Sequence, residues 1–117
     1  MVVSIPPAEL DQVFRALADS TRRDILRRTV TEGLSVSTLA DDYAMSFAAV
    51  QKHVAVLEAA GLVSKTTAGR RRLVRANRER LARARAALQQ LEALWRHRFT
   101  GLDAVLADPT PAPDTEE

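Results

Sequence analysis

The sequence predicts a mainly α-helical fold with one small β-hairpin and a long C-terminal helix. Apolar residues recur at three- and four-residue spacing in four successive segments between residues 8 and 61, and capping residues or glycine bound each segment. A stretch rich in β-branched residues follows and turns back at Ala68-Gly69. Beyond Asn77 the helical spacing returns and persists to about residue 107.

Two amphipathic helices open the chain after a short lead. Residues 1–7 form the lead, because two consecutive prolines stop the next helix from extending backward. That helix covers residues 8–18, and Asp19 and Ser20 cap a second helix over residues 21–31. The apolar residues that these helices should turn inward are Leu10, Val13, Phe14, Leu17, Ile25, Leu26 and Val30.

The next two helices are joined by a short connection. The third helix starts at Ser35 and ends at Ala44, and the fourth covers residues 46–61. Ser46 supplies a hydroxyl that can cap the fourth helix, and Gly61 can end it in the left-handed conformation. Two short helices joined by a tight turn form a helix-turn-helix, and here the turn contains no glycine.

The fourth helix has two different faces. Val50, Val54 and Leu57 fall at helical spacing on one face, which predicts their burial. The other face has short side chains near its N-terminus, one amide and one cation, and it suits entry into a DNA major groove. An ordinary surface helix is the alternative. The residues of this second face are Phe47, Ala48, Gln51, Lys52 and Ala55.

A basic hairpin follows directly and would make the arrangement a winged helix-turn-helix. Its strands cover residues 62–67 and 70–75. Residues 64–85 contain nine lysines or arginines against a single acidic residue, which is the electrostatic footprint of a polyanion-binding surface. A solvated face that keeps the protein soluble is the alternative.

The last helix should run from Arg78 to about Ala107 after a cap at Asn77. Its apolar stripe is longer than a small three-helix core can cover, so we expect a partner helix. Trp95 lies in the middle of the stripe, where an interface anchor would lie. The alternative is that it folds back on the first helix, and both arrangements can hold at once. We therefore assign one domain to residues 8–107. The acidic, proline-rich residues 108–117 should be disordered.

Composition restricts the chemistry. The chain has no cysteine and only two histidines, which excludes disulfides, thiolate sites and a multi-histidine metal site within one chain. We find no glycine-rich phosphate loop, no paired carboxylates in an apolar setting and no nucleophile beside a histidine. We therefore expect no enzyme activity, no cofactor and no metal. No apolar run approaches a membrane span and no secretory signal is present, so we expect a cytoplasmic protein.

Several stretches together resemble a known family. They are VFRALADSTRRDIL, LSVSTLADDYAMSFAAVQKHVAVLEAAGLV, the hairpin sequence GRRRLVR and LWRHRF in the last helix. These are similar to the ArsR-type winged helix-turn-helix repressors over residues 8–107. The resemblance implies a homodimeric, usually repressing transcription factor whose terminal helices form the dimer interface. The residues that would form this interface are Leu10, Phe14, Leu88, Leu91, Trp95, Phe99 and Leu102.

Departures from the family pattern place the chain near the metal-independent branch. Members that sense metals through the third helix carry cysteines there, whereas this chain has Val36 and Ser37. Members that use the terminal helix pair an aspartate with a histidine two residues later, and here Trp95 precedes His97. Gln51 stands where relatives commonly have serine. The resemblance does not indicate an effector.

The DNA-contacting set combines the fourth helix with the hairpin. Gln51 can make a bidentate contact to adenine, and Lys52 can take a guanine edge or a phosphate. Phe47 can pack on a thymine methyl or tuck back onto Tyr43, and His53 can contact DNA or make a structural hydrogen bond. Strand alternation would separate Arg71 from its two neighbours. The full set is Ser46, Phe47, Ala48, Gln51, Lys52, His53, Lys65, Arg70, Arg71 and Arg72.

The sequence thus predicts a DNA-binding regulator that forms a homodimer and represses from an inverted repeat in promoter DNA. Two alternatives remain open on the sequence alone. One is a winged-helix module whose basic cluster meets an acidic protein partner. The other is a metal-responsive repressor with a non-cysteine site. Salt-dependent binding to random duplex DNA would argue against the protein-binding module, which should lack it. A zinc or nickel effect on DNA affinity would indicate the metal-responsive repressor.

Overall fold

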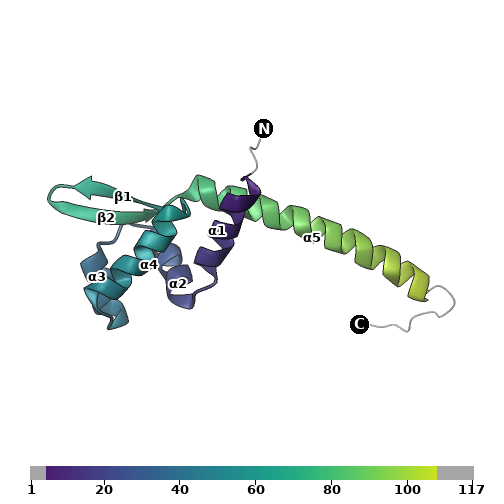
Figure 1. Ribbon diagram of the computed structural model, residues 1–117, viewed down its shortest axis with the longest axis horizontal. Helices are drawn as coiled ribbons and strands as arrows, with labels where there is room; N and C mark the ends of the chain where they lie inside the picture. Colours follow the sequence, from purple (N-terminus) through teal and green to yellow (C-terminus); the bar gives the residue numbers. More distant parts are fainter. Residues whose placement is uncertain (1–4, 108–117) are drawn as a thin grey trace. The chain divides into compact units, whose positions relative to one another are not determined.

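The computed structural model describes residues 5–107 and the side chains of residues 5–97. The chain divides into two compact units, with the boundary between Ala84 and Arg85. Within the described residues, no helix is long and apolar enough to cross a membrane. The elements in chain order are α1 (Pro7–Leu17), α2 (Ser20–Thr29), α3 (Val36–Tyr43), α4 (Phe47–Ala59), β1 (Val63–Ala68), β2 (Arg71–Ala76) and α5 (Arg78–Ala107) (Figure 1).

The helix boundaries follow the capping residues closely. Asp19 caps α2, because its carboxylate accepts a hydrogen bond of 3.0 Å from the backbone N–H of Arg22. Ser35 and Ser46 cap α3 and α4 in the same way. Helix α1 begins at Pro7, one residue earlier than predicted, because the fixed φ and missing N–H of proline suit the first helical position.

Helices α3 and α4 form the predicted helix-turn-helix. The turn between them depends on Ala44, which takes the left-handed conformation at φ +53°. This position usually belongs to glycine, because a Cβ atom clashes with the backbone there. Gly61 takes the same region at φ +77° and ends α4, as predicted.

The hairpin turn lies one residue later than predicted. Ala68 pairs with Arg71, so the loop consists of Gly69 and Arg70 rather than Ala68-Gly69. Gly69 has φ +65°, and a tight two-residue loop demands positive φ at this first position. As a result Arg70 belongs to the loop and does not follow the strand alternation that we expected for it.

The hairpin is attached to the helices through backbone hydrogen bonds. Leu34, in the loop before α3, forms an isolated antiparallel bridge with Val74 of β2. Their two hydrogen bonds measure 3.0 and 2.8 Å. A second attachment joins the residues that flank the two strands, because the N–H of Asn77, after β2, donates to the carbonyl of Leu62, before β1, at 2.8 Å. Both attachments fix the base of the hairpin and leave its loop end to project.

One apolar core joins α1 to α4 with the hairpin and the start of α5. The inward residues predicted for α4 are fully buried, while Leu10 and Leu17 of α1 pack against the core only partly buried. Ala84 of α5 is buried, and Leu81 packs against the core beside it. The largest fully buried side chains are Ile25, Leu39, Leu57, Leu62, Val13, Val50, Val54, Val74 and Thr29.

Candidate nucleic-acid interface

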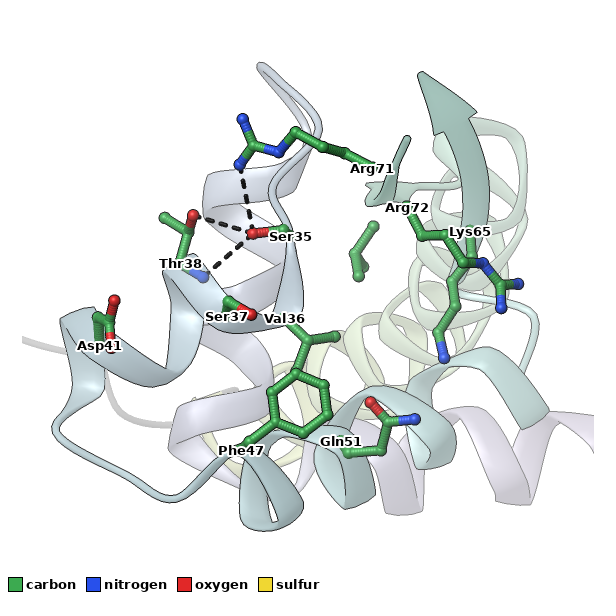
Figure 2. Close-up of a pocket in the computed structure, with 11 residues that line it drawn as sticks. Ser35, Val36, Ser37, Thr38, Asp41, Phe47, Gln51, Lys65, Arg71 and Arg72 are labelled. Carbon is green, nitrogen blue, oxygen red and sulfur yellow. Dashed lines mark hydrogen bonds between the residues drawn. The ribbon is translucent and has the colours of Figure 1, made fainter. Parts of the chain in front are cut away.

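An open hollow lies between the helix-turn-helix and the hairpin. Its volume is about 490 Å³, and α3, α4, β1 and β2 all contribute to its lining (Figure 2). The hollow combines cations, hydroxyls and an amide around a few apolar side chains, which is the mixture of groups that meets a nucleic acid. Its lining residues are Ser35, Val36, Ser37, Thr38, Asp41, Phe47, Gln51, Lys65, Arg71, Arg72 and Val74.

The outer face of α4 contributes Phe47 and Gln51 to the lining of this hollow. We use this name for Phe47, Ala48, Gln51, Lys52 and Ala55, all of which are exposed. The opposite face of the helix is fixed, because Val50, Val54 and Leu57 are fully buried. Ser46 fixes the first turn as well, since its Oγ accepts a 3.1 Å hydrogen bond from the N–H of Ala49. The outer face is therefore presented on a rigid support.

The N-terminus of α3 forms the opposite wall of the hollow. Ser35 Oγ accepts a 3.1 Å hydrogen bond from the N–H of Thr38 and donates to the Thr38 hydroxyl at 2.9 Å. Arg71 reaches across from β2 to the same Ser35 oxygen at 3.5 Å, as Figure 2 shows. Arg71 therefore joins the wing to the helix-turn-helix, on the side of the hollow away from Gln51.

The basic cluster divides into paired and unpaired cations. At the base of the hairpin, Arg80 pairs with Glu9 at 3.0 Å and Arg78 donates to the carbonyl of Val30. Toward the loop, the guanidinium groups of Arg70 and Arg72 make no hydrogen bond or ion pair within the described part of the chain. Arg70, Arg72 and, nearer the base of the hairpin, Arg75 therefore offer their charge to an external anion, while Arg78 and Arg80 at the start of α5 use their charge internally.

Lys65 belongs to the paired group. Its ammonium lies 4.0 Å from the Glu58 carboxylate of α4, and its side chain is only 16% exposed. The sequence placed Lys65 among the DNA-contacting residues. In the structure it lines the hollow and spans from β1 to α4, so binding of DNA by Lys65 would have to compete with Glu58.

His53 lies beside the start of α2 and not on the outer face of α4. Its side chain is 22% exposed, and its Nδ1 lies 3.3 Å from an Arg22 guanidinium nitrogen. The same guanidinium donates to the carbonyls of Ala16 at 2.7 Å and Arg15 at 3.2 Å. The Nδ1 atom also lies 3.8 Å from the Asp19 carboxylate, so His53 faces both a guanidinium and a carboxylate of this corner. The Arg22 side chain thus links α4 to α2 and to the end of α1.

The arginines in the first turn of α2 have carbonyl partners. Cations oppose the dipole of a helix N-terminus, so a carboxylate or phosphate partner would be expected for them. Arg22 and Arg23 instead reach back to the last carbonyls of α1, and the Arg23 bond to Leu17 measures 2.8 Å. Carbonyls in the last turn of a helix attract cations. The backbone N–H of Arg22 also lowers the pKa of Asp19.

A second network, between α2 and α3, was not found from the sequence. The Tyr43 hydroxyl donates to Asp24, and Arg28 pairs with Asp42 while lying 5.4 Å above the Tyr43 ring. Burial and the nearby carboxylate raise the pKa of Tyr43, and the Tyr43 hydrogen bond lowers the pKa of Asp24. Only the fold brings these groups together, from 14 to 19 residues apart. The network joins α3, the first helix of the helix-turn-helix, to α2.

The predicted interface residues on α5 are exposed where their side chains are described. The exposed fractions are 50% for Leu88, 47% for Leu91 and 61% for Trp95, and Leu94 beside them is 62% exposed. The side chains of Phe99 and Leu102 lie outside the described residues. Leu10 and Phe14, which belong to α1, are partly buried.

No group of three or more His, Cys, Asp or Glu side chains gathers as a metal site would require, among the residues described. Asp41, one of the acidic pair in α3, lines the hollow. Its neighbour Asp42 is held by Arg28 at the end of the α2–α3 network.

Comparisons with known proteins point to one family. Residues 17–66 match the family described as helix-turn-helix domain. The chain is 38% identical over 91 residues to the HTH-type transcriptional regulator Rv2034 of Mycobacterium tuberculosis, covering 78% of this chain and 82% of that protein. It is 35% identical to an ArsR-like transcriptional regulator from Rhodococcus sp. RHA1, whose structure gives a TM-score of 0.73 over 84% of this chain and 92% of that one.

A more distant structure shares the fold. It is the homodimeric winged helix-turn-helix DNA-binding domain of a possible ArsR-family regulator from Mycobacterium bovis. Its identity is 23% and its TM-score 0.58, over 93% of this chain and 89% of that one.

Proposed function

Because the chain belongs to the ArsR family of winged helix-turn-helix transcriptional regulators, we propose that it is a homodimeric repressor that binds an inverted repeat in promoter DNA. The observation that carries this proposal is the hollow, whose lining brings Phe47 and Gln51 of α4 together with Arg72 of the hairpin, a guanidinium without a partner among the described residues. One surface thus combines groups that read bases with groups that bind phosphates. We assign no catalytic step to this surface. We propose that the protein acts in the cytoplasm.

Helix α4 is proposed to enter the major groove by its N-terminal half. Small side chains such as Ala48 and Ala55 allow close approach, and Gln51 presents an amide that can bond to both N6 and N7 of adenine. Arg70 and Arg72 bind phosphates beside the groove. This division predicts that α4 determines sequence preference and that the hairpin supplies salt-dependent affinity.

Dimerisation is proposed to use the exposed apolar stripe of α5. Leu88, Leu91 and Trp95 recur at three- and four-residue spacing, and all three are about half exposed or more. Burial of such an apolar stripe releases the most free energy when the same stripe of a second copy covers it. The homodimeric fold relative supports this choice. A two-fold dimer would place its two α4 helices in successive major grooves, about 34–36 Å apart.

Selection of bound fragments from the source genome at about 150 mM salt tests the proposal. We expect recovery of a shared inverted repeat whose half-sites lie one helical turn apart, with two chains bound to each site. Recovery of random fragments would contradict sequence-specific repression. Absence of salt-dependent binding to any duplex would instead indicate a protein-binding module.

A further inference from the structure

We infer that Phe47 is a specificity-determining residue that reads the C5-methyl group of a thymine close to the adenine contacted by Gln51. This inference rests on the proposed function, because it names bases that the α4 outer face recognises. It assigns the DNA half-site a chemical feature: a thymine methyl on the floor of the major groove, within two base pairs of that adenine.

The first observation is the exposure of the ring. Phe47 is the first residue of α4 and keeps 55% of its surface exposed, whereas other large apolar residues of this helix, Val50, Val54 and Leu57, are fully buried. Figure 2 shows the ring in the hollow beside Gln51. An aromatic ring in water at the mouth of a basic hollow gains free energy only when a ligand covers it.

The second observation is that Tyr43, the alternative packing partner of the Phe47 ring, already has other partners. Tyr43 could have received the Phe47 ring, yet its hydroxyl bonds to Asp24 and its ring lies under the Arg28 guanidinium. The Ser46 cap also fixes the backbone at the start of α4, so Phe47 is directed outward by the helix itself. Tyr43 is thus engaged by α2, and the exposed part of the Phe47 ring is open to a ligand in the hollow.

Chemistry then selects the base. In the major groove, thymine is the natural base that presents a methyl group, and phenylalanine is among the side chains that contact it. The other groups exposed there by the bases are hydrogen-bond donors and acceptors, which a phenyl ring cannot satisfy. Phe47 therefore matches thymine. It disfavours a base whose polar groups would lose their bound water under the ring and gain no hydrogen bond in return.

Helix geometry sets the spacing of the two base-reading residues. Phe47 and Gln51 are four residues apart, so they lie on the same face with a rise of about 6 Å between them. Neighbouring base pairs are about 3.4 Å apart. A helix lying along the groove thus places the two side chains within about two base pairs of each other, and the pair reads a short A·T-containing element.

Replacement of thymine by deoxyuridine tests this inference, because it removes the methyl group and leaves base pairing unchanged. The probe is a duplex selected by the full-length protein from a randomised library. Each thymine of one half-site is replaced in turn, and affinity is measured at fixed salt. We expect one position in the half-site to lose about fourfold in affinity, the value of one buried methyl group.

Phe47→Ala should remove the sensitivity at that position and bind the thymine and uracil duplexes equally. Phe47→Leu should keep part of it, since an apolar side chain still covers the methyl group. Val56→Ala is the matched control: Val56 is also apolar and exposed on α4, at 38%, but it does not line the hollow. This variant should retain the full fourfold effect.

Two results would overturn the inference while leaving the proposed function intact. One is a selected site at which no thymine-to-uracil change alters affinity. The other is a uracil effect that persists undiminished in Phe47→Ala. Failure to select any sequence would overturn the proposed function as well. Thermal unfolding of each variant checks that it is folded, and we expect little change because the ring is already exposed.

Discussion

Arg22 is a cation in the first turn of a helix, where the dipole disfavours positive charge. Its guanidinium lies against the end of α1, where it bonds to the carbonyls of Ala16 and Arg15, and it also reaches His53 of α4. A single side chain therefore connects α1, α2 and the recognition helix. The hydrogen bond to Arg22 gives His53 a structural partner in the free protein.

Arg22→Ala should lower the free energy of unfolding by about 2 kcal/mol, because it removes several charge-assisted hydrogen bonds and leaves helix-end carbonyls unpaired. Denaturant unfolding at neutral pH measures this. Arg23→Ala is the control, since Arg23 makes one exposed bond to Leu17 and its removal should cost less than about 1 kcal/mol. Equal destabilisation of both variants would contradict the bridging role of Arg22.

Gln51→Ala should weaken the preference for one base pair in each half-site by about 1–3 kcal/mol, because the amide makes a bidentate contact to adenine. Affinity for random duplex should stay unchanged, since Gln51 carries no charge. Competition binding with single-base variants of a selected site measures both quantities. Uniform weakening on every sequence would mean that Gln51 does not read a base.

At the scale of elements, the hairpin is an arm whose base is fixed and whose tip carries unpaired charge. Arg72→Ala should therefore reduce the slope of log affinity against log salt by about 0.9 for each phosphate that the protein no longer neutralises, with sequence preference retained. Arg83→Ala is the control, because Arg83 is paired with Glu79 on α5. Binding titrations across a range of salt give the slopes, and an unchanged slope for Arg72→Ala would place the hairpin tip off the DNA.

The turn of the helix-turn-helix carries a backbone strain at Ala44. Ala44→Gly should raise the free energy of unfolding by about 0.5–1 kcal/mol, since relief of the left-handed Cβ clash exceeds the added entropy of the unfolded chain. Ala55→Gly, the same change at an exposed position inside α4, should instead destabilise by about 1 kcal/mol. Chemical denaturation compares the two, and destabilisation by Ala44→Gly would contradict the strain.

The elements were predictable from the sequence because their signals are local. The cap at Ser46, the stop at Gly61 and the burial of Val54 depend on neighbours within a turn or two of helix. The hairpin turn was displaced by one residue, because the position of Gly69 in a two-residue loop depends on strand register. The register places Val63 opposite Ala76 and Ala68 opposite Arg71, and a count of β-branched residues does not determine it.

The site was predicted less completely, because side-chain pairs depend on the tertiary fold. The composition of the outer face of α4 follows from periodicity, and its exposure agrees with that expectation. The sequence did not indicate that Arg22 would meet His53, 31 residues away, or that Lys65 would lie against Glu58. Nor did charge counting separate the arginines of the hairpin that have no partner among the described residues from the paired arginines at the start of α5.

At the scale of the whole molecule, function depends on a second copy of the chain. Leu91→Glu should convert the proposed dimer to a monomer, because it places a charge in the apolar stripe of α5. Gln90→Glu introduces the same charge at an exposed polar position and should leave the dimer intact. Sedimentation equilibrium gives the mass of each variant. A dimer that persists in Leu91→Glu would place the interface elsewhere.

The central claim is that one surface combines base reading by α4 with phosphate binding by the hairpin. The most direct test is the ratio of affinities for a selected inverted repeat and for a scrambled duplex of equal length, measured at about 150 mM salt. We predict a ratio of at least about 10³, with two chains bound to the repeat. Equal affinities for the two duplexes would contradict the account.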